Sequence, residues 1–311
     1  MVTYYRLPPI GTLFSLARML KTAPDQLLAL AETATTMYRP VPMRKKDGSV
    51  RLTFDAFPPL KSAQARIQCL ILRRVDYPPY LLGGLKGRDH ARNAEIHCGC
   101  RTLVSEDITS FFDSVSADLI YDIWSRLFRF PPTVAGCLTK LTTKDGRLPQ
   151  GAKTSSFLAN LVFWREEPAL YEHLARLGIQ YTRFIDDITC SSKRDLTNSE
   201  ISHVVERIAG MCKAKRLKLK RSKYQIIRAG SRMVATKLVV NERVALPTEE
   251  RSNIRWLTLK LARSSSDLRR RRSESYTEEY HSISGRLGTL KRFHLDEATK
   301  LRTILREVKP L

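Results

Sequence analysis

The spacing of apolar residues predicts helices along much of the chain. Residues 13–32 have leucines three and four positions apart, interrupted by Pro24, which predicts a short helical N-terminal region within residues 1–40. Another apolar stripe predicts a helix over residues 60–75. Helical spacing returns towards the end of the chain, over residues 280–311.

Polar residues that can cap a helix mark the starts of further helices. Ser116, the Thr-Ser-Ser run at 154–156 and Thr248 each precede an apolar stripe, and their hydroxyls can accept a hydrogen bond from a free amide of the first turn. Two glutamates follow Thr248, where the helix dipole favours acidic side chains. A separate stripe predicts one more helix over residues 201–212.

Short runs of extendable residues predict antiparallel strands. Residues 102–108 form one such run, which ends close to an aspartate. Two more runs, 179–184 and 188–191, flank an Ile-Asp-Asp sequence, so a hairpin with two carboxylates at its tip is expected. An Asp-Gly pair within residues 44–51 predicts a second hairpin with a basic rim. Tight hairpins mixed irregularly with helices indicate an α+β fold.

The charge of the chain indicates a polyanionic partner. Its 311 residues include 54 Lys and Arg but 31 Asp and Glu, a formal net charge of +23. Solubility does not require so large an excess, so nucleic acid is the expected partner, and a generally solvated basic surface is the alternative. No apolar run is long enough to span a membrane, and residues 1–10 lack a leader-peptide pattern, so we expect a cytoplasmic protein without membrane contact.

Three aspartates form the strongest candidate for a metal site. Asp186 and Asp187 are adjacent at the tip of the expected hairpin, where like charges repel unless a cation neutralises them. Oxygen ligands suit Mg²⁺, and Asp107, near the end of another expected strand, would complete a site for two ions. An aspartate pair alone is more often a solvated turn, so the order of the neighbouring motifs decides between these interpretations.

Two other motifs give weaker predictions. Six scattered cysteines indicate reduced thiols, and the His-Cys-Gly-Cys sequence at 97–100 has no second Cys or His pair at zinc spacing. Residues 146–154 resemble a phosphate-binding P-loop, but Ala152 is inserted between the second glycine and the lysine, and Pro149 lacks an amide donor. A zinc protein and a nucleoside triphosphatase are therefore both disfavoured.

Three motifs in sequence order resemble the core of the bacterial retron-type reverse transcriptases. They are Asp-Ile-Thr-Ser-Phe-Phe at 107–112, Leu-Pro-Gln-Gly at 148–151 and Phe-Ile-Asp-Asp at 184–187. Residues 93–97 match the retron Asn-Ala-x-x-His signature, and residues 235–240 stand where the family has Val-Thr-Gly. The chain departs from the family in having Phe184 in place of Tyr and Lys237 in place of Gly.

The resemblance implies a right-hand polymerase fold. Residues 41–245 would form the fingers and a palm with an antiparallel sheet, and residues 246–311 a helical, RNA-binding thumb. Asp107, Asp186 and Asp187 would be catalytic and hold two Mg²⁺ ions.

Further residues are implied to bind the incoming deoxynucleoside triphosphate. Phe112 would exclude a 2′-hydroxyl, with core packing as the alternative, and Lys45 would help to clamp the triphosphate, with an exposed turn as the alternative. The implied nucleotide-binding residues are Arg51, Lys45, Phe112, Gln150, Gly151 and Lys223. For Lys223, proton donation to pyrophosphate and a plain phosphate contact are both open.

Two clusters of basic residues are candidates for nucleic-acid contact. Seven of the eleven residues at 213–223 are basic, and four arginines follow one another at 269–272. Such dense positive charge repels itself unless an anion binds there, so phosphate contacts that do not read sequence are expected, with a solvated surface as the alternative for the arginine run. The residues expected to bind nucleic acid are Lys218, Lys220, Arg221, Arg269, Arg270, Arg271 and Arg272.

The function implied by the resemblance is RNA-templated DNA synthesis. The enzyme would copy a structured non-coding RNA from a 2′-hydroxyl within it, giving a branched RNA–DNA product (msDNA) that joins an effector protein in antiphage defence. Three alternatives stay open: a reverse transcriptase of the group II intron or diversity-generating branch, a catalytically silent RNA-binding scaffold, and a nuclease. Primer extension separates the last two from a polymerase.

Overall fold

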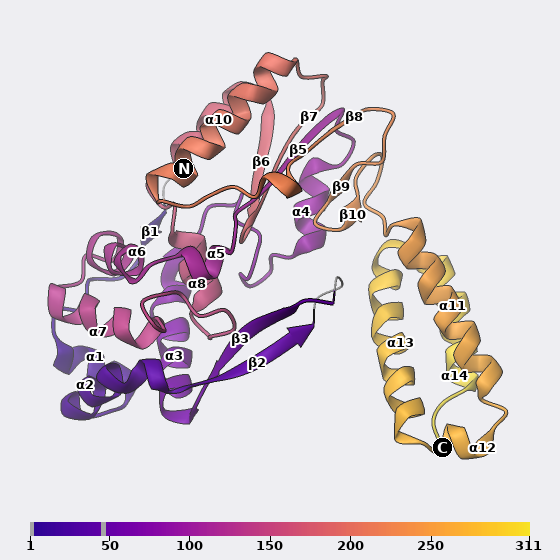
Figure 1. Cartoon of the computed structure of the whole chain (residues 1–311), viewed down its shortest axis with the longest axis horizontal. Helices are drawn as coiled ribbons and strands as arrows, with labels where there is room; N and C mark the ends of the chain where they lie inside the picture. The colour runs from indigo at the N-terminus through magenta and orange to yellow at the C-terminus, as the bar shows by residue number, and fades with distance from the viewer. Residues whose placement is uncertain (1–2, 45–47) are drawn as a thin grey trace.

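The computed structural model describes residues 3–44 and 48–311, and its architecture is α+β. In Figure 1 a β-sheet with helix α10 lies at the top, the N-terminal helices and a long hairpin lie below it, and the C-terminal helices stand to the right. Strands β2 and β3 extend towards the side on which these C-terminal helices stand.

In the described part of the chain, the central sheet has four antiparallel strands in the order β6-β7-β5-β8. The strands are β5 (Thr102–Asp107), β6 (Ile179–Phe184), β7 (Asp187–Ser192) and β8 (Gln225–Arg228). Helices α4 (His90–His97) and α9 (Glu167–Arg176) pack against β6, and α10 (Asn198–Ala214) packs against α9. Because helices cover the sheet, Ser105 is the one residue of β5 that is not buried.

The hairpin consists of β2 (Tyr38–Arg44) and β3 (Val50–Ala56), which pair along their full length. The hairpin predicted over 44–51 is confirmed, although Asp47 of its expected turn lies outside the described residues. Four helices pack against one another beside it: α1 (Leu13–Leu20), α2 (Pro24–Thr33), α3 (Pro58–Leu70) and α7 (Pro132–Thr142). The predicted N-terminal helices, divided before Pro24, are therefore confirmed.

Short elements connect these parts. They are β1 (Tyr4–Tyr5), β4 (Val75–Asp76), α5 (Phe111–Ser114), α6 (Ala117–Asp122) with a π-helical turn (Ile123–Leu127), α8 (Ser155–Leu161), β9 (Val234–Ala235) and β10 (Leu238–Val239). The C-terminal helices are α11 (Thr248–Ser264), α12 (Leu268–Arg271), α13 (Glu274–Phe293) and α14 (Leu295–Glu307).

Three predicted details are wrong. The helix expected over 60–75 ends at Leu70 because Val75 pairs instead with Tyr5 of β1. Thr154 stands at the N-cap of α8, but its hydroxyl is buried without a hydrogen-bond partner among the described residues. Thr248 is the first residue of α11 and not its cap, because the extended Pro247 takes the cap position. The cap at Ser116 is confirmed, since its Oγ accepts from the Leu119 amide at 3.4 Å.

Within residues 3–44 and 48–311, buried apolar side chains form two clusters. The larger joins the N-terminal helices, the hairpin and most of the sheet. The smaller joins α4, β9, β10 and the C-terminal helices. The salt bridge between Arg292 and Asp89 (2.5 Å) ties the end of α13 to the start of α4, so the C-terminal helices are anchored at that point. No helix in the described ranges is both long and apolar enough to cross a membrane.

His97 links β6 and β7, the two strands of the hairpin whose turn carries the aspartate pair (the acidic hairpin). Its Nδ1 lies 2.7 Å from Ser191 Oγ on β7, and its Nε2 lies 2.7 Å from Thr182 Oγ1 on β6. The side chain is fully buried, and burial lowers the pKa of His97 from 6.5 to about 3. The imidazole is therefore neutral at physiological pH, with both nitrogens used within the fold.

This buried histidine predicts acid sensitivity. The unfolded chain binds a proton at His97 below about pH 6.5, whereas the folded chain does not until about pH 3, so the stability that His97 contributes at neutral pH is lost as pH falls through this window. Between pH 7 and pH 5 the loss should be about 2 kcal/mol. Urea unfolding should show this loss as a change in the stability difference between the wild type and His97→Gln, which can keep hydrogen bonds and does not titrate, because Glu106 and Asp187, whose pKa values are raised, titrate in both proteins. An equal pH dependence in both proteins would contradict the assignment.

Candidate active site

Two of the three aspartates lie on neighbouring strands of the central sheet, and the third lies in the β6–β7 turn. Asp107 is the last residue of β5 and is directly opposite Asp187, the first residue of β7. Directly opposed residues of an antiparallel pair have Cβ atoms about 4.5–5.5 Å apart. Asp186 is in the hairpin turn, where its carbonyl accepts a hydrogen bond from the Ile108 amide at 3.0 Å. The structure therefore brings all three together, and their catalytic role stays a prediction.

The electrostatics of this group favour a bound cation. Burial, together with the nearby charge of Asp107, raises the pKa of Asp186. Burial also raises the pKa of Asp187, and the charge of Asp186 and a hydrogen bond with Asp107 add to that rise. Each upward shift means that the carboxylate form is disfavoured by its surroundings. A positive charge placed among these side chains would relieve that cost.

Lys223 supplies one positive charge at the site. Its Nζ lies 2.7 Å from Asp107 Oδ1. Partial burial favours the neutral amine, but the hydrogen bond to Asp107 and the charges of the other two aspartates outweigh it and raise the pKa of Lys223. Lys223 was expected to contact nucleotide phosphate. In the structure it forms a salt bridge with Asp107, which is a predicted metal ligand.

The donor set fits an oxygen-preferring divalent ion. All three candidates offer carboxylate oxygens, which are the ligands that Mg²⁺ prefers. Across the described ranges, no three His, Cys, Asp or Glu side chains already converge at metal-holding distance. Asp107 is paired with Lys223. At residues 97–100, both ring nitrogens of His97 lie at hydrogen-bond distance from hydroxyl groups, and the Cys98 thiol donates to the Glu242 carbonyl at 3.1 Å.

The Leu-Pro-Gln-Gly segment is hydrogen-bonded to the β2–β3 hairpin. The Gln150 carbonyl accepts a hydrogen bond from the Phe54 amide of β3 at 2.7 Å. Gly151 has a φ of 108°, and a Cβ built on it would lie 2.9 Å from the Phe54 carbonyl oxygen, so glycine is required there. Arg51, on the same strand β3, is close enough for its charge to lower the pKa of Asp186 against the dominant upward shift. Lys45 lies outside the described residues.

The two phenylalanines after Asp107 differ in their surroundings. Phe111 is buried and stacks on Phe163 with ring centroids 6.2 Å apart. Phe112 is half-buried and touches Phe111 at a centroid distance of 6.0 Å. The core therefore uses Phe111, which leaves part of the Phe112 ring free to contact a ligand.

The predicted nucleic-acid-binding residues fall into two groups. Lys218, Lys220 and Arg221 are exposed, and backbone hydrogen bonds from Thr109 to Lys218 (2.8 Å) and from Lys220 to Asp107 (2.7 Å) hold this segment beside β5.

The arginine run lies far along the chain, around α12. Arg269, Arg270 and Arg272 are exposed, and Arg270 is 3.4 Å from Glu279. Arg271 uses its guanidinium within the fold: Nε donates to the Lys309 carbonyl at 2.6 Å, which fastens the end of the chain.

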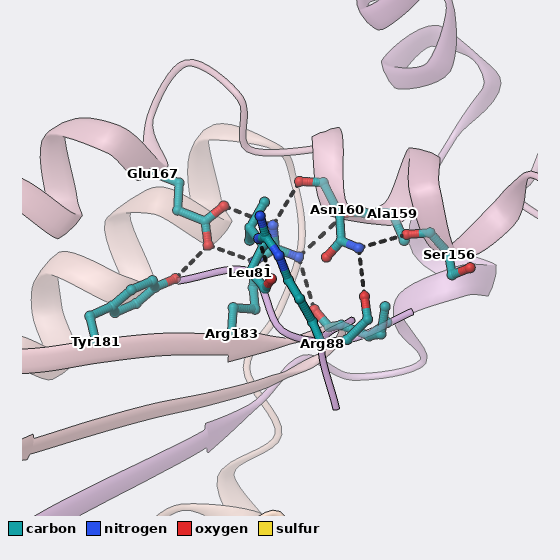
Figure 2. Close-up of polar contacts among 10 residues, drawn as sticks. Leu81, Arg88, Ser156, Ala159, Asn160, Glu167, Tyr181 and Arg183 are labelled. Atoms are coloured by element: carbon teal, nitrogen blue, oxygen red, sulfur yellow. Dashed lines mark hydrogen bonds and ion pairs between the residues drawn. The ribbon is translucent and has the colours of Figure 1, made fainter. Parts of the chain in front are cut away.

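Sequence reasoning missed the buried ion pair of Arg183 and Glu167, which supports the turn between β6 and β7. Ile185 has a φ of 62°, a left-handed conformation that costs a β-branched residue about 1–3 kcal/mol. Its carbonyl accepts a hydrogen bond from Arg183, a fully buried arginine paired with Glu167 (Figure 2). The available signal was a charged residue at a strand position whose alternate neighbours, Ile179 and Tyr181, are apolar.

Comparison with known proteins identifies the family. The family model described as reverse transcriptase (RNA-dependent DNA polymerase) matches residues 43–261. The retron Se72 reverse transcriptase of Salmonella heidelberg (strain 579083-10) is 34% identical over 97% of this chain and 81% of that protein. The retron Ec48 reverse transcriptase of Escherichia coli is 28% identical over 97% of this chain and 77% of that protein.

A solved telomerase from Candida albicans aligns with a TM-score of 0.46 at 8% identity, covering 90% of this chain and 59% of that one, which is too distant to bear on function. The family match assigns a right-hand fold and implies a divalent metal cofactor, an RNA template and deoxynucleoside triphosphates. The chain belongs to the retron reverse transcriptases and is an RNA-directed DNA polymerase.

Proposed function

We propose that this polymerase copies a structured non-coding RNA, starts from a 2′-hydroxyl within that RNA and leaves a branched RNA–DNA product, msDNA. The observation that carries the proposal is the juxtaposition of Asp107, Asp186 and Asp187. A cation at this end of the sheet would stabilise their carboxylates. The family membership supplies the RNA template. We extend the proposal to an effector protein that joins the product in antiphage defence.

Asp107, Asp186 and Asp187 would be the catalytic residues and would hold two Mg²⁺ ions. With the ions bound, the attacking hydroxyl loses its proton more readily and the charge of the leaving pyrophosphate is neutralised. Lys223, now bonded to Asp107, would offer its ammonium group to phosphate. Arg51 would bind the triphosphate from the fingers hairpin, and Lys45 would assist there.

Three residues would shape the nucleotide site. Gln150 and Gly151 would lie against the incoming nucleotide, because their backbone is fastened to β3 and glycine permits close approach. The free part of the Phe112 ring would lie under the sugar and exclude a 2′-hydroxyl. Rejection would then be steric, which a single bulky side chain can provide.

The chain would divide into an N-terminal helical region (1–40), fingers and palm (41–245) and thumb (246–311). The mutual packing of α11, α13 and α14 supports a helical thumb. Phosphate contacts would come from Lys218, Lys220 and Arg221 beside the palm and from Arg269, Arg270 and Arg272 on the thumb. Arg271 would contribute least, because its guanidinium is already bonded to the C-terminal segment.

The nucleic acid that copurifies with the protein tests this proposal. The protein should be expressed with its native flanking DNA in a bacterium, purified, and its bound nucleic acid analysed with ribonuclease and deoxyribonuclease. We expect a short DNA covalently joined to RNA in the wild type and RNA alone in Asp186→Asn. RNA without attached DNA in both proteins would refute synthesis from a 2′-hydroxyl and favour an RNA-binding scaffold or another branch.

A further inference from the structure

The guanidinium of Arg183 is completely enclosed by hydrogen-bond acceptors. The side chain is 0% exposed. Its Nε donates to Glu167 Oε1 at 2.6 Å, and one terminal nitrogen donates to Glu167 Oε2 at 2.7 Å, which makes a two-pronged ion pair. The remaining donors reach the carbonyls of Asn160 (2.9 Å), Ala159 (3.4 Å) and Ile185 (3.0 Å). An arginine has five N–H donors, and each has an acceptor here.

The acceptors come from separate elements, and Glu167, Ala159 and Asn160 among them are seen around Arg183 in Figure 2. Glu167 begins α9 and also accepts a hydrogen bond from the Tyr181 hydroxyl of β6 at 2.7 Å. Ala159 and Asn160 belong to the last turn of α8. Ile185 is in the turn between β6 and β7. A buried ion pair is weak evidence for stability, because apolar residues of similar volume often serve as well. Its directional bonds are the feature that apolar packing cannot replace.

The hairpin turn needs such support. The left-handed φ of Ile185 persists only where the surroundings fix it. Gly83 packs closely against the same residue. A Cβ built on Gly83 would lie 2.6 Å from Ile185 Cγ1 and 2.8 Å from the Ile185 amide nitrogen, so there is no room for a side chain. The Arg183 backbone is bonded to this loop as well, because its carbonyl accepts from the Leu82 amide at 2.9 Å.

From this geometry we propose that Arg183 is a positioning residue for polymerisation. Its guanidinium fixes the Ile185 carbonyl, and this fixes the directions in which Asp186 and Asp187 present their carboxylates to the reacting groups. The inference rests on the proposed catalytic role of these two aspartates. Glu167 holds the guanidinium in place, and the Gly83 loop closes the turn from the other side. Catalysis is sensitive to such placement, because an error of about 1 Å can cost about a hundredfold in rate.

Single-turnover primer extension tests the proposal. Full-length enzyme in excess is mixed with a primer annealed to RNA that the wild type extends, at saturating deoxynucleotide, so the rate constant does not depend on the fraction of folded enzyme. Arg183→Lys keeps the charge but has three donors for five acceptors. We expect its rate constant to fall about a hundredfold, while affinity for the primer–template changes less than about threefold because phosphate contacts elsewhere supply it.

A variant that weakens the core without touching the turn is the matched control. Leu174 of α9 is 0% exposed, so Leu174→Ala creates a cavity on the helix that also carries Glu167. We expect Leu174→Ala to lower the melting temperature and to leave the single-turnover rate constant within about twofold of wild type. A rate constant for Arg183→Lys equal to that of Leu174→Ala would overturn the proposal, because Arg183 would then contribute to folding alone.

Gly83→Ala keeps the test decisive if Arg183→Lys does not fold. It leaves the ion pair intact and pushes a methyl group against Ile185, so it should lower the same rate constant. Gly210→Ala on α10 is its control, because a Cβ there meets no described atom within 4 Å. Equal rates in the two glycine variants would also overturn the proposal. Activity that survives in Asp186→Asn would refute the aspartate assignment, a result distinct from either comparison.

Discussion

Asp186→Asn should abolish DNA synthesis while the protein stays folded and bound to RNA. The substitution removes one anionic ligand from the proposed metal site and keeps nearly the same shape. Stabilisation of transition-state charge by metal ions is worth several kcal/mol, so the rate of primer extension should fall by about a thousandfold or more. Radiolabelled primer extension with Mg²⁺ measures this loss directly.

Stability and RNA affinity distinguish this result from misfolding. The raised pKa of Asp186 means that its ionised form costs folding free energy above that pKa, so the neutral Asn should leave the melting temperature at neutral pH unchanged or higher. RNA affinity rests on phosphate contacts elsewhere and should change little. Asp118→Asn, at an exposed aspartate of α6, is the control and should extend primer normally. Full activity in Asp186→Asn would refute the site.

Phe112→Ala should allow the enzyme to incorporate ribonucleotides. Phe112 is half-buried, and the core position beside it is filled by Phe111, so the free part of the Phe112 ring can lie under the sugar. Removing the ring opens space for a 2′-hydroxyl. We expect discrimination between deoxynucleotides and ribonucleotides, as the ratio of kcat/KM values, to fall about 10- to 100-fold. Single-nucleotide extension with each substrate gives the two values.

The neighbouring phenylalanine separates this effect from general damage. Phe111→Leu removes the ring that stacks on Phe163 inside the core, so it should lower the melting temperature and leave sugar discrimination unchanged. If Phe112→Ala instead loses stability and keeps its discrimination, the ring packs in the core and another residue selects the sugar.

Much of the acidic hairpin could be predicted because its signals are local. Residues 179–184 and 187–192 contain extendable runs on either side of the turn, and the structure has β6 and β7 there. An aspartate on a neighbouring strand was expected as well, whereas the register that sets Asp107 opposite Asp187 comes from the pairing of β5 with β7. The catalytic role of these residues remains a prediction, and so do the nucleotide and nucleic-acid contacts.

Contacts between distant residues explain what the sequence pattern did not predict. Val75 is not part of the helix expected over 60–75, because it pairs with Tyr5, which is distant in the sequence. Ser155 donates its hydroxyl to the Pro149 carbonyl at 2.5 Å, an arrangement that helical spacing does not show. Arg183 was not singled out because a charged residue in a strand usually faces solvent, and Glu167, Asn160 and Ala159 are brought around it only by the fold.

Strand β5 contributes side chains to both hydrophobic clusters. Leu103 belongs to the cluster of the C-terminal helices, whereas its neighbour Val104 belongs to the larger cluster. Side chains alternate along a strand, so Asp107 is on the same face as Leu103. Cooperative unfolding units follow such clusters, so local opening of the C-terminal unit removes packing from one face of β5. A nucleic acid bound to the C-terminal helices would hold this unit closed, and would therefore also make β5, the strand that ends in Asp107, more rigid.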